Sequence, residues 1–128
     1  MQLSKRGVKG DLEKQILNTL YQVIADTKSP GEAEKILGDA LTEVELMTVA
    51  KRLAIAKYLR SGKSYEEIHD QLKVSSATIA AIQTKMGSGK GFEEALTKIE
   101  ADQWANRWAE KIMRWLGMKS ELDINGGK

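Results

Sequence analysis

Apolar residues recur at the spacing of an α-helix along almost the whole chain, and no stretch alternates apolar and polar residues as a strand would. The first such segment follows Asp11, which we expect to cap the helix. Its apolar stripe consists of residues spaced four apart, namely Leu12, Ile16, Leu20 and Ile24. A length of 128 residues suits one domain with a short appendage. The pattern therefore predicts an all-α fold.

Further capping patterns mark where later helices begin. Ser29 precedes Pro30, which places proline at the first helical position. Thr42 and Ser64 each stand three residues before a glutamate, which is the spacing of a capping box. The helix that follows Thr42 is expected to run to Arg60. Because its apolar residues lie on several faces, we expect it to be buried on more than one side.

These boundaries divide the chain into parts. The glycines at 87–91 are interpreted as a flexible connector. We expect a basic flexible arm over 1–10, a helical domain over 11–91, a C-terminal helix or helices over 92–117 and a disordered tail over 118–128. The apolar stripe of the C-terminal segment drifts near residues 100–102, so a bend or break is expected there.

Composition excludes several classes of function. One proline and no cysteine rule out a disulfide scaffold, a zinc–thiolate site and thiol catalysis. The one histidine, His69, is expected to face solvent, and no carboxylates are spaced to converge on a pocket. We therefore expect no enzyme, metal or cofactor. No apolar run approaches the length of a membrane span, so we expect a cytoplasmic protein with no membrane partner.

The net charge of +2 does not by itself indicate nucleic-acid binding. The distribution is more informative, because Lys5, Arg6 and Lys9 make the first ten residues basic without any acid. The middle of the chain, 43–91, is mildly basic between acidic flanks. On charge alone, ordinary solvated helix faces remain the simpler interpretation.

Residues 65–84 have the apolar spacing of a helix-turn-helix. Counted from Tyr65, apolar residues occupy the fourth, eighth, tenth, fifteenth and eighteenth positions, which are Ile68, Leu72, Val74, Ile79 and Ile82. Two short helices need this set to pack at a steep angle around a tight turn. The opposite face of the second helix is then free to enter a DNA major groove. We place the whole unit over residues 64–86.

A longer run of residues resembles a known family. The resemblance is carried by the segments Leu41-Thr42-Glu43-Val44-Glu45, 50–59, Gly62, 64–68 and Ala77-Thr78-Ile79. They are similar to the Trp repressor superfamily, and within it to the YerC/YecD-like branch. The resemblance implies an intertwined homodimer that reads double-stranded DNA with its helix-turn-helix units in successive major grooves. It therefore implies a sequence-specific transcriptional regulator, acting as a repressor.

The resemblance also bears on a small-molecule effector. In the Trp repressor two arginines clamp the corepressor, and Arg52 matches the first of them. The second falls on Ala81, which cannot hold a carboxylate, so tryptophan is not the expected corepressor. Arg52 also has a structural interpretation, as a residue that caps a helix or forms an ion pair between subunits.

The DNA contacts are expected from the turn and the second helix. Lys73 stands where the motif commonly has glycine, and a left-handed lysine there costs about 1 kcal/mol. We expect base contacts from Ser76, Ala77, Ala80, Ala81, Gln83 and Thr84, and backbone contacts from Ser64, Tyr65, Lys73, Ser75, Thr78 and Lys85. The glutamine can read adenine bidentately, and the alanines can contact thymine methyl groups. The alternative is that these small residues merely form a good exposed helix.

The last helical segment contains all three tryptophans, Trp104, Trp108 and Trp115. They share one face with Ala101 and Ile112. The simpler interpretation is that this stripe packs on the domain or across a dimer. The alternative function is a helical dimeric protein-interaction module that keeps the fold and binds partners through this helix.

Overall fold

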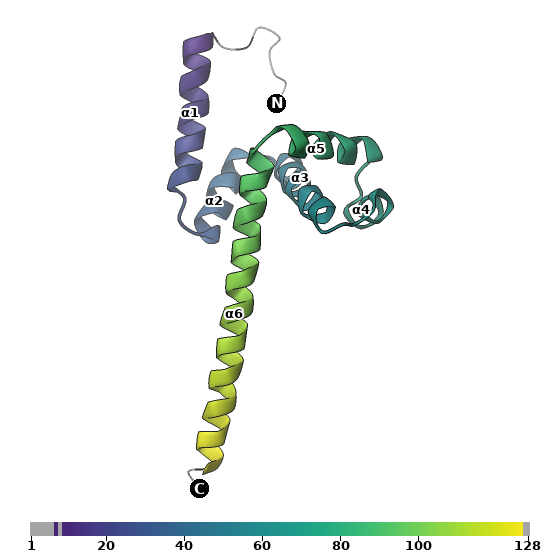
Figure 1. Cartoon of the computed structure of the whole chain (residues 1–128). Helices are drawn as coiled ribbons and strands as arrows, with labels where there is room; N and C mark the ends of the chain where they lie inside the picture. Colours follow the sequence, from purple (N-terminus) through teal and green to yellow (C-terminus); the bar gives the residue numbers. More distant parts are fainter. Residues whose placement is uncertain (1–6, 8, 127–128) are drawn as a thin grey trace. The chain divides into compact units, whose positions relative to one another are not determined.

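The computed structural model describes residues 7 and 9–126, with side chains up to residue 117. The described residues form six α-helices and no strand, so the all-α prediction is confirmed (Figure 1). The helices are α1 (Gly10–Asp26), α2 (Pro30–Ala40), α3 (Glu43–Arg60), α4 (Tyr65–Leu72), α5 (Ser76–Ser88) and α6 (Gly91–Gly126). The basic arm expected over 1–10 lies largely outside the described residues.

The helices belong to two compact units, of which the first ends at Thr48 and the second begins at Val49. In the first unit no residue of α1 or α2 is buried. The apolar stripe of α1 is exposed instead, as are Val44 and Met47 at the start of α3. The first unit therefore has amphipathic helices whose apolar residues are exposed.

The predicted helix starts are confirmed, with one exception. The hydroxyl of Ser29 accepts a hydrogen bond from the backbone N–H of Glu32 at 3.1 Å. The N–H of Thr42 donates to Glu45 Oε1 at 2.9 Å, and the N–H of Glu45 donates to Thr42 Oγ1 at 3.1 Å. Asp11 is not the cap of α1, because this helix begins one residue earlier, at Gly10. Asp11 lies in the first turn, where a carboxylate still favours the positive end of the helix dipole.

The core lies in the second unit, where α3, α4, α5 and α6 meet. Its buried residues are Ile55, Ala56, Ile68, Ile79, Ile82 and Leu96. Leu72 and Val74 are partly buried against them, so the apolar set predicted for the helix-turn-helix is confirmed. Burial of α3 on more than one side is not observed, because only Ile55 and Ala56 of this helix are buried. Tyr58 and Leu59 are partly buried against the core, whereas Val44, Met47, Val49 and Leu53 are exposed.

The end of α3 is tied to α6. The guanidinium of Arg60 donates to Glu93 Oε1 at 2.7 Å and lies 3.4 Å from Glu100 Oε1. Gly62 follows with a φ of 85°, the left-handed conformation that glycine adopts freely. The contacts of Arg60 with Glu93 and Glu100 join the first turns of α6 to the end of α3.

Three predictions for the C-terminal segment are wrong. We expected a bend near residues 100–102, an end at Gly117 and a disordered tail over 118–128. Instead α6 is one helix of 36 residues from Gly91 to Gly126, drawn unbroken in Figure 1. A glycine inside a helix costs only about 1 kcal/mol, so a helix can continue through it. Residues 127 and 128 lie outside the described residues.

Candidate nucleic-acid interface

The turn between α4 and α5 has the geometry of a helix-turn-helix. Lys73 adopts φ 56° and ψ 52°, and its N–H donates to the His69 carbonyl oxygen at 2.9 Å. This is the left-handed conformation that most motifs of this type assign to glycine. The strain of about 1 kcal/mol is offset by the packing of Leu72 and Val74 on either side of the turn.

Two side chains hold this turn closed. The imidazole Nδ1 of His69 lies 2.6 Å from the carbonyl oxygen of Val74. The hydroxyl of Ser75 caps α5, because it accepts from the Thr78 N–H at 3.1 Å and lies 2.9 Å from Thr78 Oγ1. His69 is exposed, as expected, but it bridges the turn as well. The sequence separation of His69 and Val74 does not predict this contact, because the contact depends on the conformation of the turn between them.

A second link joins the start of α4 to the middle of α5. Ser64 caps α4 by accepting from the Glu67 N–H at 3.2 Å. The next residue, Tyr65, donates its phenol hydroxyl to Gln83 Oε1. The predicted bidentate contact of Gln83 with adenine therefore shares the amide oxygen with Tyr65, whereas its amide N–H₂ group remains free to donate to the base. Both Tyr65 and Gln83 were expected to contact DNA.

The outer face of α5 is open to solvent and has small side chains. Its residues predicted to contact bases are all exposed: Ser76, Ala77, Ala80, Ala81, Gln83 and Thr84. The Thr84 hydroxyl donates to the Ala80 carbonyl oxygen at 3.0 Å. Because none of these side chains is bulky or charged, the α5 backbone can approach a nucleic-acid groove closely. Lys73 and Lys85 are the cations of the turn and of the far end of this helix.

The side chain of Lys63, between α3 and α4, is held against the domain. Its Nζ donates to Gln71 Oε1 at 3.0 Å and lies 4.4 Å from the centre of the Tyr58 ring. The exposed acids Glu66 and Asp70 lie on α4 itself. The first helix of the motif thus offers less positive charge than the turn and α5.

Arg52 of α3 does reach a hollow next to α5. The hollow has a volume of about 440 Å³ and is lined by Arg52, Ala77, Thr78, Ala81, Ile82, Lys85 and Phe92. Ala81 occupies the position of the second clamping arginine, and its side chain carries no charge. Lys85 stands one helical turn after Ala81 and supplies a second cation to the same hollow. The spacing of four residues between Ala81 and Lys85 is the sequence signal for this second cation, and the prediction did not include it.

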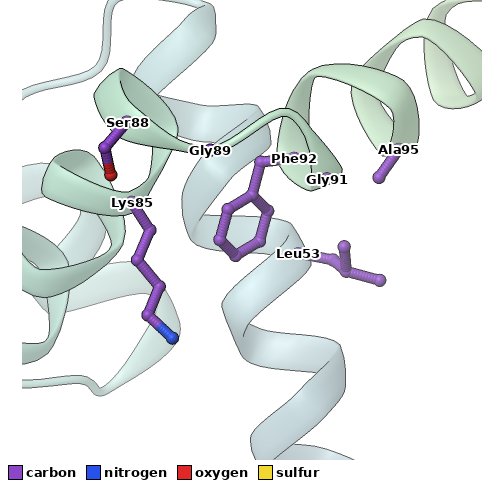
Figure 2. A pocket seen from close by; sticks show the side chains of 7 residues that line it. All are labelled: Leu53, Lys85, Ser88, Gly89, Gly91, Phe92 and Ala95. Atoms are coloured by element: carbon purple, nitrogen blue, oxygen red, sulfur yellow. The ribbon is translucent and has the colours of Figure 1, made fainter.

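An adjoining hollow of about 400 Å³ is mainly apolar. Figure 2 shows the Phe92 ring, at the start of α6, between Leu53 of α3 and Lys85 of α5. Of the residues that line it only Lys85 is charged. This hollow lacks the paired polar groups that a polar small molecule needs.

Comparisons with known proteins agree with this geometry. The family profile of the Trp repressor protein matches residues 15–108. The chain belongs to the Trp repressor family. The uncharacterized protein YerC of Bacillus subtilis is 29% identical over 85 residues, which cover 66% of this chain and 82% of YerC. The crystal structure of a TrpR-like protein from Eubacterium eligens has a TM-score of 0.65 at 26% identity, and the match covers 72% of this chain and 96% of the other.

The Trp repressor match covers the two predicted sites but not the whole of α6. The helix-turn-helix and Arg52 lie inside residues 15–108, whereas α6 continues to Gly126. Among the described residues no helix is both long and apolar enough to span a membrane. In the same part of the chain no three His, Cys, Asp or Glu side chains gather as a metal site would require.

Proposed function

We propose that this protein is a sequence-specific regulator of transcription that binds double-stranded DNA as a dimer and acts as a repressor. The observation that carries the proposal is the closed α4–α5 turn, which leaves the small-residue face of α5 exposed. Membership of the Trp repressor family supports it. In this proposal α5 enters the major groove, and α4 crosses above it.

The chemistry of the exposed face suits direct reading of bases. Ala77 and Ala80 can contact thymine methyl groups, and the hydroxyl of Ser76 can donate to or accept from a base edge. The N-terminus of α5, beside Ser75, offers backbone N–H groups to a phosphate. Lys73 and Lys85 add charge that neutralises phosphates. With so few cations, we expect a modest salt dependence.

The proposed dimer explains the exposed apolar side chains of α1 and α3. Leu12, Ile16, Leu20 and Ile24 of α1 are exposed, as is Leu53 of α3. Exposed apolar surface of this extent is typical of an interface. A second copy that covers these helices gives two helix-turn-helix units related by two-fold symmetry. This arrangement predicts operator half-sites about 10 base pairs apart.

Selection from random duplexes, followed by a salt titration, tests the proposed function. We expect enrichment of a two-fold symmetric site that binds more weakly as salt rises. The proposal fails if no site is enriched and no salt-sensitive duplex binding is found at low ionic strength. Sedimentation of Ile16→Glu/Leu20→Glu tests the dimer, since two charges on the exposed stripe should halve the mass of the assembly.

A second candidate function is control by a small anion. Arg52 and Lys85 line one hollow, so it suits a molecule with a carboxylate, and the partner residues differ from those expected for tryptophan. A thermal-shift screen of amino and other carboxylic acids tests this site. Stabilisation that is lost in Arg52→Ala and Lys85→Ala, but kept in Arg107→Ala, supports it. Equal stabilisation of all variants would contradict it.

A further inference from the structure

The exposed face of α5 carries one amide side chain, that of Gln83. Ser76, Ala80 and Gln83 are spaced four and three residues apart, so they lie in one row along the helix. The first two side chains are small, whereas the glutamine amide offers an acceptor and a donor side by side. Gln83 is therefore the residue of this row that can distinguish bases through two hydrogen bonds at once.

The phenol group of Tyr65 holds this amide in one orientation. Tyr65 is the first residue of α4, and its hydroxyl donates to Gln83 Oε1. Its ring is partly buried against the core, in which Ile68 and Ile79 are fully buried. Because a tyrosine side chain has two rotatable bonds, a packed ring leaves its hydroxyl little freedom. The exposed amide of Gln83 is thus held by a group that the core itself holds.

The hydrogen bond from Tyr65 leaves the amide of Gln83 with a free edge of defined polarity. An amide oxygen has two lone pairs, and Tyr65 occupies one of them. The second lone pair and the N–H₂ group form one acceptor beside one donor. In the major groove adenine presents a donor, N6–H₂, beside the acceptor N7, whereas guanine presents two acceptors, N7 and O6. The held amide therefore matches adenine and places its oxygen against an acceptor of guanine.

We propose that Tyr65 is a positioning residue that makes Gln83 select adenine over guanine. The inference rests on the proposed function, in which α5 enters the major groove. A glutamine without this bond can rotate its amide by about 180°, since its last torsion is broad and roughly two-fold, and can then donate to guanine. In the held amide the same rotation gives up the hydrogen bond that Tyr65 donates. Tyr65, which was expected to contact the DNA backbone, acts instead through Gln83.

The same contact lowers the entropic cost of reading a base. Glutamine is among the side chains that lose most rotamer freedom when they become ordered. Because Tyr65 orders the amide of Gln83 in the folded protein, part of that loss occurs on folding rather than on binding. Removal of the phenol hydroxyl should therefore weaken binding to a site with adenine more than binding to a site with guanine.

Selection from random duplexes with the full chain and its variants tests the proposal. Gln83→Met removes the amide at similar volume, so the base pair that Gln83 contacts is the position whose preference disappears in this variant. At that position the wild-type chain should prefer adenine to guanine by about tenfold or more, as expected for a bidentate contact. Competition binding on the two duplexes measures the ratio.

Tyr65→Phe keeps the packed ring and removes only the hydroxyl. We expect the preference for adenine over guanine to fall by about 2- to 10-fold, the range for one neutral hydrogen bond, without change at other positions. Tyr58→Phe is the matched control, because Tyr58 lies on α3 and its ring contacts Lys63. In the Gln83→Met background, Tyr65→Phe should change the base preference no further.

A measurement on the free protein tests the contact without DNA. Nitrogen-15 relaxation of the Gln83 side-chain N–H₂ group reports how rigidly the amide is held. Its order parameter should fall in Tyr65→Phe and stay at the wild-type value in Tyr58→Phe. An equal order parameter in all three proteins would show that the phenol hydroxyl does not hold the amide, and it would overturn the proposal.

The binding results separate the role of Tyr65 from the proposed function. The proposal is overturned if Gln83→Met changes no base preference, if the wild-type chain prefers guanine at that position, or if Tyr65→Phe keeps the full preference for adenine. It is also overturned if Tyr65→Phe changes the preference further in the Gln83→Met protein, because Tyr65 then acts on the DNA directly. Any of these results with an enriched duplex leaves the proposed function standing. Failure to enrich any duplex overturns the proposed function, and the selection of adenine with it.

Discussion

His69 Nδ1 lies 2.6 Å from the carbonyl oxygen of Val74, across the turn that joins the two helices of the helix-turn-helix. The carbonyl can only accept, so the ring nitrogen donates and the imidazole carries its proton at Nδ1. The contact closes the turn from outside, while Leu72 and Val74 close it from the core side. The position of α5 relative to α4 therefore depends on a residue that sequence patterns treat as ordinary surface.

Loss of this contact should weaken the domain. His69→Ala removes one hydrogen bond and leaves the Val74 carbonyl to water, so we expect the free energy of unfolding to fall by about 0.5–1.5 kcal/mol. Urea unfolding followed by circular dichroism measures the change. Asp70→Ala, at the neighbouring exposed position, is the control and should change stability little. Equal stability of His69→Ala and wild type would show that the contact does not support the turn.

Lys73→Gly should affect stability and DNA binding in opposite directions. Glycine relieves the left-handed strain at φ 56° and should raise the free energy of unfolding by about 1 kcal/mol. The same substitution removes one cation from each subunit of the proposed dimer, so the slope of log affinity against log salt should fall by about 2. Urea unfolding and a salt titration on the selected duplex check both effects. A less stable Lys73→Gly protein would contradict the strain, and an unchanged slope would contradict the phosphate contact.

The capping box at the start of α3 should make stability depend on acid pH. The hydrogen bond from the Thr42 backbone N–H, followed by that from the Thr42 side chain, lowers the pKa of Glu45 below its ordinary value of 4.5. A carboxyl whose pKa is lower in the folded state stabilises the fold above its unfolded pKa. That contribution is lost as pH falls below 4.5 and through the folded pKa.

Glu45→Gln isolates this effect. The amide oxygen can still accept from Thr42, but it does not titrate, so the drop in stability below pH 4.5 should become shallower. Thermal unfolding between neutral and acid pH measures the slope, and Glu43→Gln in the same turn is the control. The account is wrong if Glu45→Gln and wild type lose stability in parallel as pH falls.

Local features of the fold were predictable, and contacts made across turns were not. The spacing of Ile79 and Ile82 predicts their burial, since helical period alone places them on one face of α5, and Ile68 and Leu72 share one face of α4 in the same way. The caps at Ser29 and Thr42 are equally local. The contact between His69 and Val74 needs the left-handed Lys73 to bring them together, so no periodic pattern contains it.

The errors in α6 and in the candidate effector site have different origins. Gly117 is a common stop signal, but a glycine inside a helix costs only about 1 kcal/mol, so the helix can continue through it. Ala81 offers no charge, whereas Lys85 reaches the same hollow from the next turn. Only the second case required the three-dimensional position of a side chain one turn away.

The most direct test of the account is the equilibrium affinity of Ala80→Glu for the duplex enriched by selection. Ala80 lies on the exposed face of α5, so a carboxylate there should leave the fold intact and repel phosphate and base acceptors in the groove. We expect a loss of affinity of about 100-fold, which corresponds to about 2.7 kcal/mol. Asn106→Glu, which adds the same charge on α6, should bind as wild type does. If Ala80→Glu also binds like wild type, α5 does not read the DNA and the proposed function is contradicted.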